Sequence, residues 1–168
     1  TYQAREPRMA EGNGANRLEA AEAIAKGLTG GSLPLHLTTL PYRNGLGQPV
    51  VHAVLDIGAQ GFSSATADRP LSVEIYAYLM KEGRVLDSLA ASTSVDLSKV
   101  GNAVRSSGLQ ILTAFPLPTH AASLRFFVRA GESGPTGSIQ QNVTAPAFAS
   151  GQPVLSAPLF NLPLTGRM

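Results

Sequence analysis

The chain contains no cysteine and no tryptophan, and only 14% of its 168 residues are charged. The lack of cysteine excludes disulfides and thiolate metal sites, but it does not fix the compartment. No apolar run approaches the roughly 20 residues of a membrane-spanning helix. The 13 basic residues are spread along the chain, and 11 acidic residues nearly balance them. A nucleic-acid-binding protein would concentrate its basic residues in one stripe, so this class is excluded.

Glycine and proline, in contrast, are plentiful, with 17 and 12 residues, and many separate short apolar runs. The clearest run, Leu71–Lys81, places its apolar side chains at every second position: Leu71, Val73, Ile75, Ala77 and Leu79. A period of two predicts a strand with one face in a core. Because Glu82-Gly83 is a two-residue turn signal and Arg84–Val95 alternates again, the two runs are expected to form a β-hairpin.

Five further segments show strand-like patterns: 33–41, 48–57, 109–116, 121–130 and 138–143. A helical crossover is expected from Asp96, a plausible N-cap, to Gly108. Seven short strands at this spacing are typical of two packed antiparallel sheets. We therefore expect an all-β fold, an immunoglobulin- or fibronectin-like sandwich over residues 32–144, although the Cys and Trp of true immunoglobulin domains are absent.

The two ends of the chain differ from this middle. Residues 1–31 predict an extended arm and a short amphipathic helix that begins near Asn16 and packs on the sandwich. The apolar face of this helix is expected to hold Leu18, Ala21, Ala25 and Leu28, with Ile24 beside them. Residues 145–168 combine four prolines with seven large apolar residues, which indicates an extended tail lying on another surface.

Two groups of residues are candidates for chemistry. His36 and His52 lie on strands that could pair, with Asp56 near enough to complete a zinc site, but solvent-facing histidines are the favoured interpretation. Asp56, Glu74 and Asp87 could gather as a glycosidase-like carboxylate pair, yet carboxylates on the outer side of strands usually serve solubility. Because no serine sits in a nucleophile elbow either, the sequence predicts no enzyme, no cofactor and no metal site.

Aromatic residues suggest a binding surface instead. Tyr76 and Tyr78 fall on the outward face of the best strand, and Phe127 is out of phase with its apolar neighbours. Such a surface suits another polypeptide or a sugar ring. Together with the apolar tail, these residues form the predicted partner-binding set: Tyr76, Tyr78, Phe127, Phe148, Leu155, Leu159 and Phe160.

Several segments also resemble a known family, namely Leu33–Arg43, Gly83–Ser88, Val95–Ser98, Ser107–Leu109 and Gly151–Phe160. Together they are similar to the carboxy-terminal β-rich region that follows the von Willebrand factor A-like domain in secreted bacterial proteins of Acidobacteria and related phyla. The resemblance spans about residues 17–160. It implies a periplasmic, cell-surface or extracellular location and an adhesion or scaffolding role, and it supplies no catalytic residue.

The sequence thus predicts a non-enzymatic interaction or scaffolding module that binds other protein subunits through its terminal arms and outward aromatic face. A carbohydrate-binding module that uses the tyrosines is the alternative. Since the chain begins at Thr1, it is expected to be a processed form or a piece of a longer protein.

Overall fold

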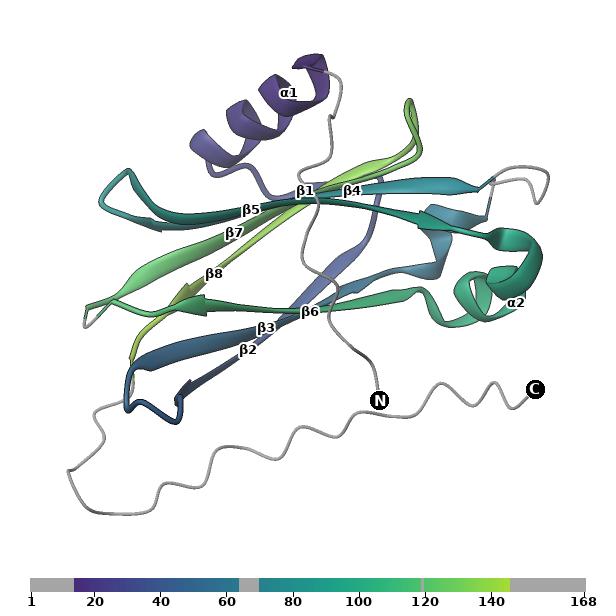
Figure 1. The fold of residues 1–168 in the computed structure, drawn as a ribbon. Helices are drawn as coiled ribbons and strands as arrows, with labels where there is room; N and C mark the ends of the chain where they lie inside the picture. The colour runs from purple at the N-terminus through teal and green to yellow at the C-terminus, as the bar shows by residue number, and fades with distance from the viewer. Residues whose placement is uncertain (1–13, 64–69, 119, 146–168) are drawn as a thin grey trace.

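A computed structural model describes residues 14–63, 70–118 and 120–145. Two antiparallel sheets face each other, as Figure 1 shows, with one helix on the outer side of the larger sheet and another at one end of the sandwich. The elements are α1 (Gly14–Ala25), β1 (Gly30–Gly31), β2 (Leu35–Arg43), β3 (Pro49–Ile57), the 3₁₀ helix η1 (Ala59–Phe62), β4 (Leu71–Lys81), β5 (Arg84–Val95), α2 (Leu97–Ser107), β6 (Leu109–Pro116), β7 (Ala122–Ala130) and β8 (Thr136–Val143).

The larger sheet has the strand order β1-β8-β7-β4-β5, and the smaller sheet has the order β2-β3-β6. All pairings within both sheets are antiparallel. The expected all-β sandwich is therefore confirmed.

The central hairpin has the predicted bounds. Lys81 pairs with Arg84, and the two turn residues Glu82 and Gly83 adopt φ values of 50° and 78°. Positive φ at both positions is what a two-residue type I′ turn requires. One residue of β5, Leu86, has no cross-strand partner, because the register shifts between Leu79 and Met80. Such a bulge increases the local twist of the strand.

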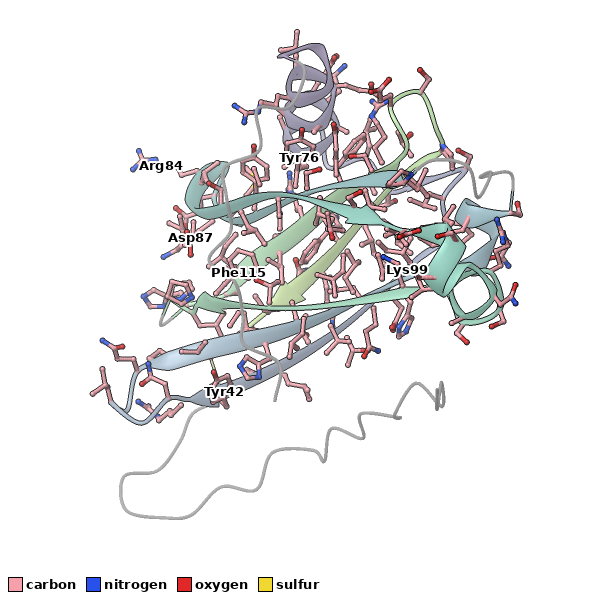
Figure 2. All side chains as sticks on the ribbon, turned by 45° about the vertical axis from the view of Figure 1, so that its right-hand side comes forward. Tyr42, Tyr76, Arg84, Asp87, Lys99 and Phe115 are labelled. Atoms are coloured by element: carbon pink, nitrogen blue, oxygen red, sulfur yellow. The ribbon has the colours of Figure 1, made fainter. Side chains whose placement is uncertain are left out.

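The core lies between the sheets and is built by the alternation seen in the sequence. Side chains at every second position of β4 and β7 meet those of β3 and β6, and all of the following are buried: Val73, Ile75, Ala77, Leu79, Leu124, Phe126, Val128, Val51, Ala53, Leu55 and Phe115. Phe115, which Figure 2 labels between the sheets, makes an edge-to-face contact with Phe126, with ring centroids 6.4 Å apart.

Helix α1 packs on the larger sheet as expected, but through a different face. Ala20, Ala23 and Ile24 are buried, whereas Leu18 and Leu28 are 71% and 54% exposed. Of the predicted set only Ile24, expected beside the face, is buried, so the predicted face was wrong for the other four residues. The reason is the aromatic surface below: small residues let the helix approach the rings of the sheet closely, and the larger leucines remain in solvent.

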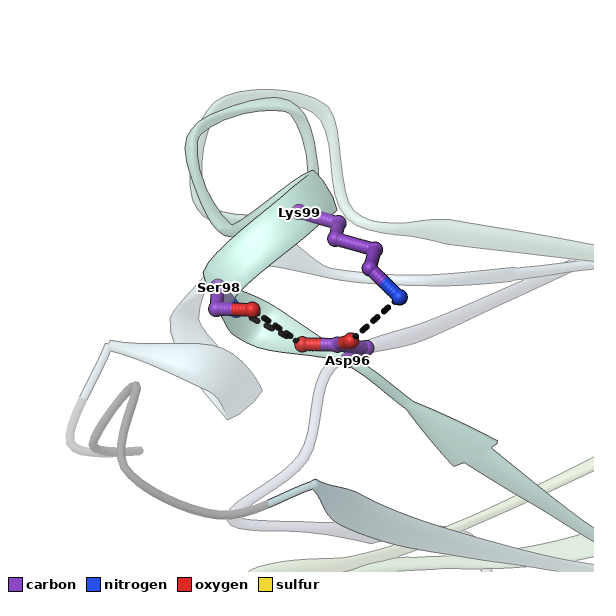
Figure 3. A network of polar contacts seen from close by, with 3 residues as sticks. All are labelled: Asp96, Ser98 and Lys99. Atoms are coloured by element: carbon purple, nitrogen blue, oxygen red, sulfur yellow. Dashed lines mark hydrogen bonds and ion pairs between the residues drawn. The ribbon is translucent and has the colours of Figure 1, made fainter.

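Helix α2 begins as predicted. The Asp96 side chain accepts hydrogen bonds from the Ser98 main chain and hydroxyl, and its other oxygen lies 3.1 Å from Lys99 Nζ (Figure 3). The helix ends at Gly108, whose φ of 76° is disfavoured for any residue with a side chain. A Cβ at Gly108 would also lie 2.1 Å from the carbonyl oxygen of Ile57, so glycine is required there.

Candidate interaction surfaces

The predicted aromatic surface exists, but helix α1 covers it. Tyr76 and Phe127 lie opposite each other on β4 and β7, with ring centroids 6.3 Å apart, on the outer side of the larger sheet. Only 5% of Tyr76 and 4% of Phe127 is exposed, because both pack against the small residues of α1. Figure 2 shows Tyr76 beneath the helix. The prediction that these two residues form a free outward surface is therefore corrected.

Tyr78 lies at the margin of this cluster and is partly buried. The remaining members of the predicted partner-binding set, Phe148, Leu155, Leu159 and Phe160, lie outside the described residues. The alternation in the sequence correctly placed Tyr76 and Phe127 on the outer side of the larger sheet. What it could not reveal is the segment that lies over them.

Two arginines of β7 hold α1 in place. Arg125 Nη1 donates hydrogen bonds to the carbonyl oxygens of Ile24, at 2.5 Å, and Ala25, at 3.5 Å. These carbonyls belong to the last turn of the helix, and that of Ile24 also accepts the Gly27 amide at 3.1 Å, so the guanidinium adds a charged donor where the helix dipole favours a cation. Arg129, 7% exposed, forms an ion pair with Glu19 of the same helix. The helix is thus fixed by charge as well as by apolar contact.

Burial, followed by the nearby carboxylate of Glu74, raises the pKa of Tyr76 above its usual range. The Tyr76 hydroxyl donates to Glu74 at 3.4 Å. A phenol in this state stays protonated at neutral pH and acts as a hydrogen-bond donor rather than as a base.

The outer side of the smaller sheet is a second surface, which we call the small-sheet face. Strand register places on it four residues from each of the three strands: His36, Thr38, Leu40, Tyr42, Val50, His52, Val54, Asp56, Gln110, Leu112, Ala114 and Pro116. Leu112 is 63% exposed although it is a large apolar residue within a strand. Asp56 is the only residue of the set with a formal charge when histidine is neutral.

Polar side chains on the small-sheet face are paired with one another. The Tyr42 hydroxyl and His52 Nε2 are 2.8 Å apart, and their rings lie 4.4 Å apart between centroids. At the other end of the face, Asp56 accepts a hydrogen bond from Gln110 Nε2 at 2.8 Å and lies 3.5 Å from His36 Nδ1. These pairs reduce the cost of covering the face, because polar groups that are already bonded lose less on removal from water.

The considered zinc site is not assembled. His36 is opposite Asp56, whereas His52 is opposite Leu40, so the two histidines take different partners. Within the ranges that the structure describes, no three histidine, aspartate or glutamate side chains are grouped to hold a metal ion. His36 and His52 share the small-sheet face but do not lie opposite each other, because the hairpin register offsets them.

The carboxylates of Asp56, Glu74 and Asp87 do not lie on a common surface either. Asp56 lies on the small-sheet face, and Glu74 lies on the outer side of the larger sheet, opposite Ser92. Asp87 is opposite the core residue Leu79 and so belongs to the other side of that sheet. They occupy three separate surfaces and cannot act as a pair.

Comparisons with known proteins do not identify a family for this chain. No family model matches the chain, and no curated protein or solved structure is similar to it. Among the described helices, none has the length and apolar character needed to cross a membrane.

Sequence reasoning missed the small-sheet face, although one signal was present. Ile111 and Leu112 are adjacent, and so are Val50 and Val51. Two apolar neighbours in a strand place one side chain on each side of the sheet. The inward member enters the core in each case, so the outward member indicates a second apolar surface.

Proposed function

We propose that this chain is a non-enzymatic β-sandwich module, of immunoglobulin or fibronectin type, that binds other polypeptides within a larger assembly. The observation that carries the proposal is the small-sheet face. Helix α1 covers the outer side of the larger sheet, but no helix or strand of the described residues covers the corresponding side of the smaller one.

The chemistry of the small-sheet face supports a polypeptide partner. The centres of protein interfaces are depleted in charge and enriched in aromatic residues. Here Leu112, Leu40 and His52 lie in the two middle rows. Tyr42 lies in one end row, and the charge of Asp56 is confined to the opposite end. The terminal arms remain part of the proposal, since the apolar residues of 145–168 suit a contact with another subunit.

An exported, cell-envelope location is also proposed. It is supported by the resemblance to the β-rich region of von Willebrand factor A-related secreted proteins and by the low charge of the chain. The alternative, a carbohydrate-binding module, would have to rely on the partly buried Tyr78, because Tyr76 and Phe127 lie beneath α1.

Site-specific photo-crosslinking in the organism that encodes the chain tests this role. A benzophenone side chain at position 112 should yield one discrete protein adduct, because the partner covers this position. Val100 of α2, also apolar and 44% exposed, is the matched control and should yield none. Equal yields at positions 112 and 100, or no adduct at position 112 with normal expression, would contradict the proposal.

A further inference from the structure

The sheet edges of this protein are protected to very different degrees. Strand β1 pairs with only two residues of β8 and leaves the last five of β8 at the edge, β2 contains Pro41, and β6 is eight residues long and ends in Pro116. Proline and short length are common ways of preventing strand addition. Strand β5 has neither form of protection: it is twelve residues long, lacks proline and forms one edge of the larger sheet.

Charge does not protect this edge either. The charged residues of β5 are Arg84 and Asp87, both at the hairpin end, where the Leu86 bulge also lies. From Ser88 to Val95 the strand has the uncharged sequence Ser-Leu-Ala-Ala-Ser-Thr-Ser-Val. An edge of eight uncharged residues is a template for pairing with another strand.

The free backbone groups of this stretch can be identified. The Gly131 amide donates to the Ser72 carbonyl at 2.7 Å, on the side of β4 away from β5. The N–H and C=O groups of one strand residue point to the same side of the strand. Both groups of Ser72 therefore point away from β5, and Ser72 makes no backbone hydrogen bond to Ser94, the residue opposite it. The backbone groups of Ser94 therefore point to the edge of the sheet, where no strand of the described residues pairs with β5. The direction of the backbone groups alternates from residue to residue along a strand, so the groups of Ser92, Ala90 and Ser88 also point to this edge.

The core is also incompletely covered beside this edge. Leu89 of β5 and Leu109 and Ile111 of β6 are only partly buried, although all three pack on the core. Thr93 lies opposite the core residue Val73 and is itself exposed. A strand added to β5 would extend the larger sheet over these side chains and remove more apolar surface from water.

We propose that β5 pairs with β5 of a second copy of this chain, in antiparallel orientation, to form a dimer with one continuous sheet. A twofold axis beside Ala91 pairs Ser88 with Ser94 and Ala90 with Ser92 of the second copy, so edge-facing residues meet one another, as an isologous interface requires. Small uncharged side chains meet without repulsion or steric conflict. The stretch carries no charged group, and its one leucine, Leu89, packs on the core of its own chain, so little on it would select a foreign peptide, which favours self-pairing.

A proline at position 92 tests the proposal, with Ser92→Ala as the matched control. Both changes remove the hydroxyl contact between Ser92 and Ser72, which spans 3.2 Å, but only proline also removes the edge-facing amide. Because that amide makes no bond to β4, the hairpin should be retained. Sedimentation velocity of the full chain should show a reversible monomer–dimer equilibrium. Ser92→Pro should weaken dimerisation at least tenfold, and Ser92→Ala should change it less than threefold.

Ala90→Pro, compared with Ala90→Ser, repeats the test at a second edge-facing amide. Hydrogen exchange gives an independent measure: the amides of residues 88, 90, 92 and 94 should exchange more slowly as protein concentration rises. A chain that stays monomeric at millimolar concentration, or a dimer that both proline variants leave intact, would overturn the proposal. Position 112 lies on the other sheet, so this outcome would not affect the crosslinking test of the proposed function.

Discussion

At the scale of single residues, Asp96 shows how one side chain fixes the start of an element. Hydrogen bonds from Ser98, supported by the ammonium group of Lys99, hold the pKa of Asp96 below its usual range (Figure 3). A carboxylate with a lower pKa in the folded state stabilises the protein above its unfolded pKa. This contribution is lost as the pH falls through the folded pKa.

Asp96→Asn is expected to reveal this contribution, because asparagine caps a helix well but does not titrate. At pH 7 the parent chain should melt at a higher temperature than the variant, since only Asp96 carries charge opposite Lys99. The difference should shrink steadily below about pH 4, where the carboxylate gains a proton. Thermal melts followed by circular dichroism from pH 7 to pH 2 measure it, and a difference that does not change with pH would contradict this account.

At the scale of elements, α1 shows what sequence can and cannot predict. Its existence follows from a run of good helix formers, but the face it buries does not, because a twelve-residue helix with this many alanines has no dominant apolar side. The choice is made by the sheet. Arg125 lies 101 residues from its partner Ile24, and Arg129 lies 110 residues from Glu19, so no local pattern contains the information.

Ala23→Asp, compared with Ala21→Asp, tests whether α1 is held by its buried face. Ala23 is 8% exposed, whereas Ala21 lies in solvent. Both changes replace alanine by aspartate in the same helix, so they lower helix propensity equally and differ only in whether the new carboxylate is buried. The buried carboxylate should lower the free energy of unfolding by about 1–3 kcal/mol more than the exposed one.

The same variant should also expose Tyr76. With α1 released, the main cause of the raised pKa disappears, and the pKa of Tyr76 should fall toward its usual value. Ultraviolet titration of tyrosine ionisation follows this change, and the apolar dye ANS should bind the uncovered rings. A titration curve that is the same for both variants would show that α1 is not what buries Tyr76.

At the scale of the whole molecule, the architecture was readable because inward side chains repeat at every second position in each strand. Leu124, Phe126 and Val128 show this pattern in β7, and all three are buried. The same pattern does not predict what lies over the outer side of each sheet. A side chain directed away from the core can meet solvent, as Leu112 does, or a helix from elsewhere in the chain, as Phe127 does, and the alternation is identical in both cases.

The contrast between the core and the small-sheet face leads to a quantitative expectation. Phe126, 1% exposed, joins the sheets through Phe115, whereas Leu112 is 63% exposed. Phe126→Ala should cost about 3–5 kcal/mol, because it leaves a cavity between the two sheets. Leu112→Ala should cost less than about 1 kcal/mol, since the isolated chain already exposes most of this side chain. Urea unfolding of both variants measures the difference. If Leu112→Ala proved as costly as Phe126→Ala, the small-sheet face would already be covered within the free chain, and no partner would be needed to explain it.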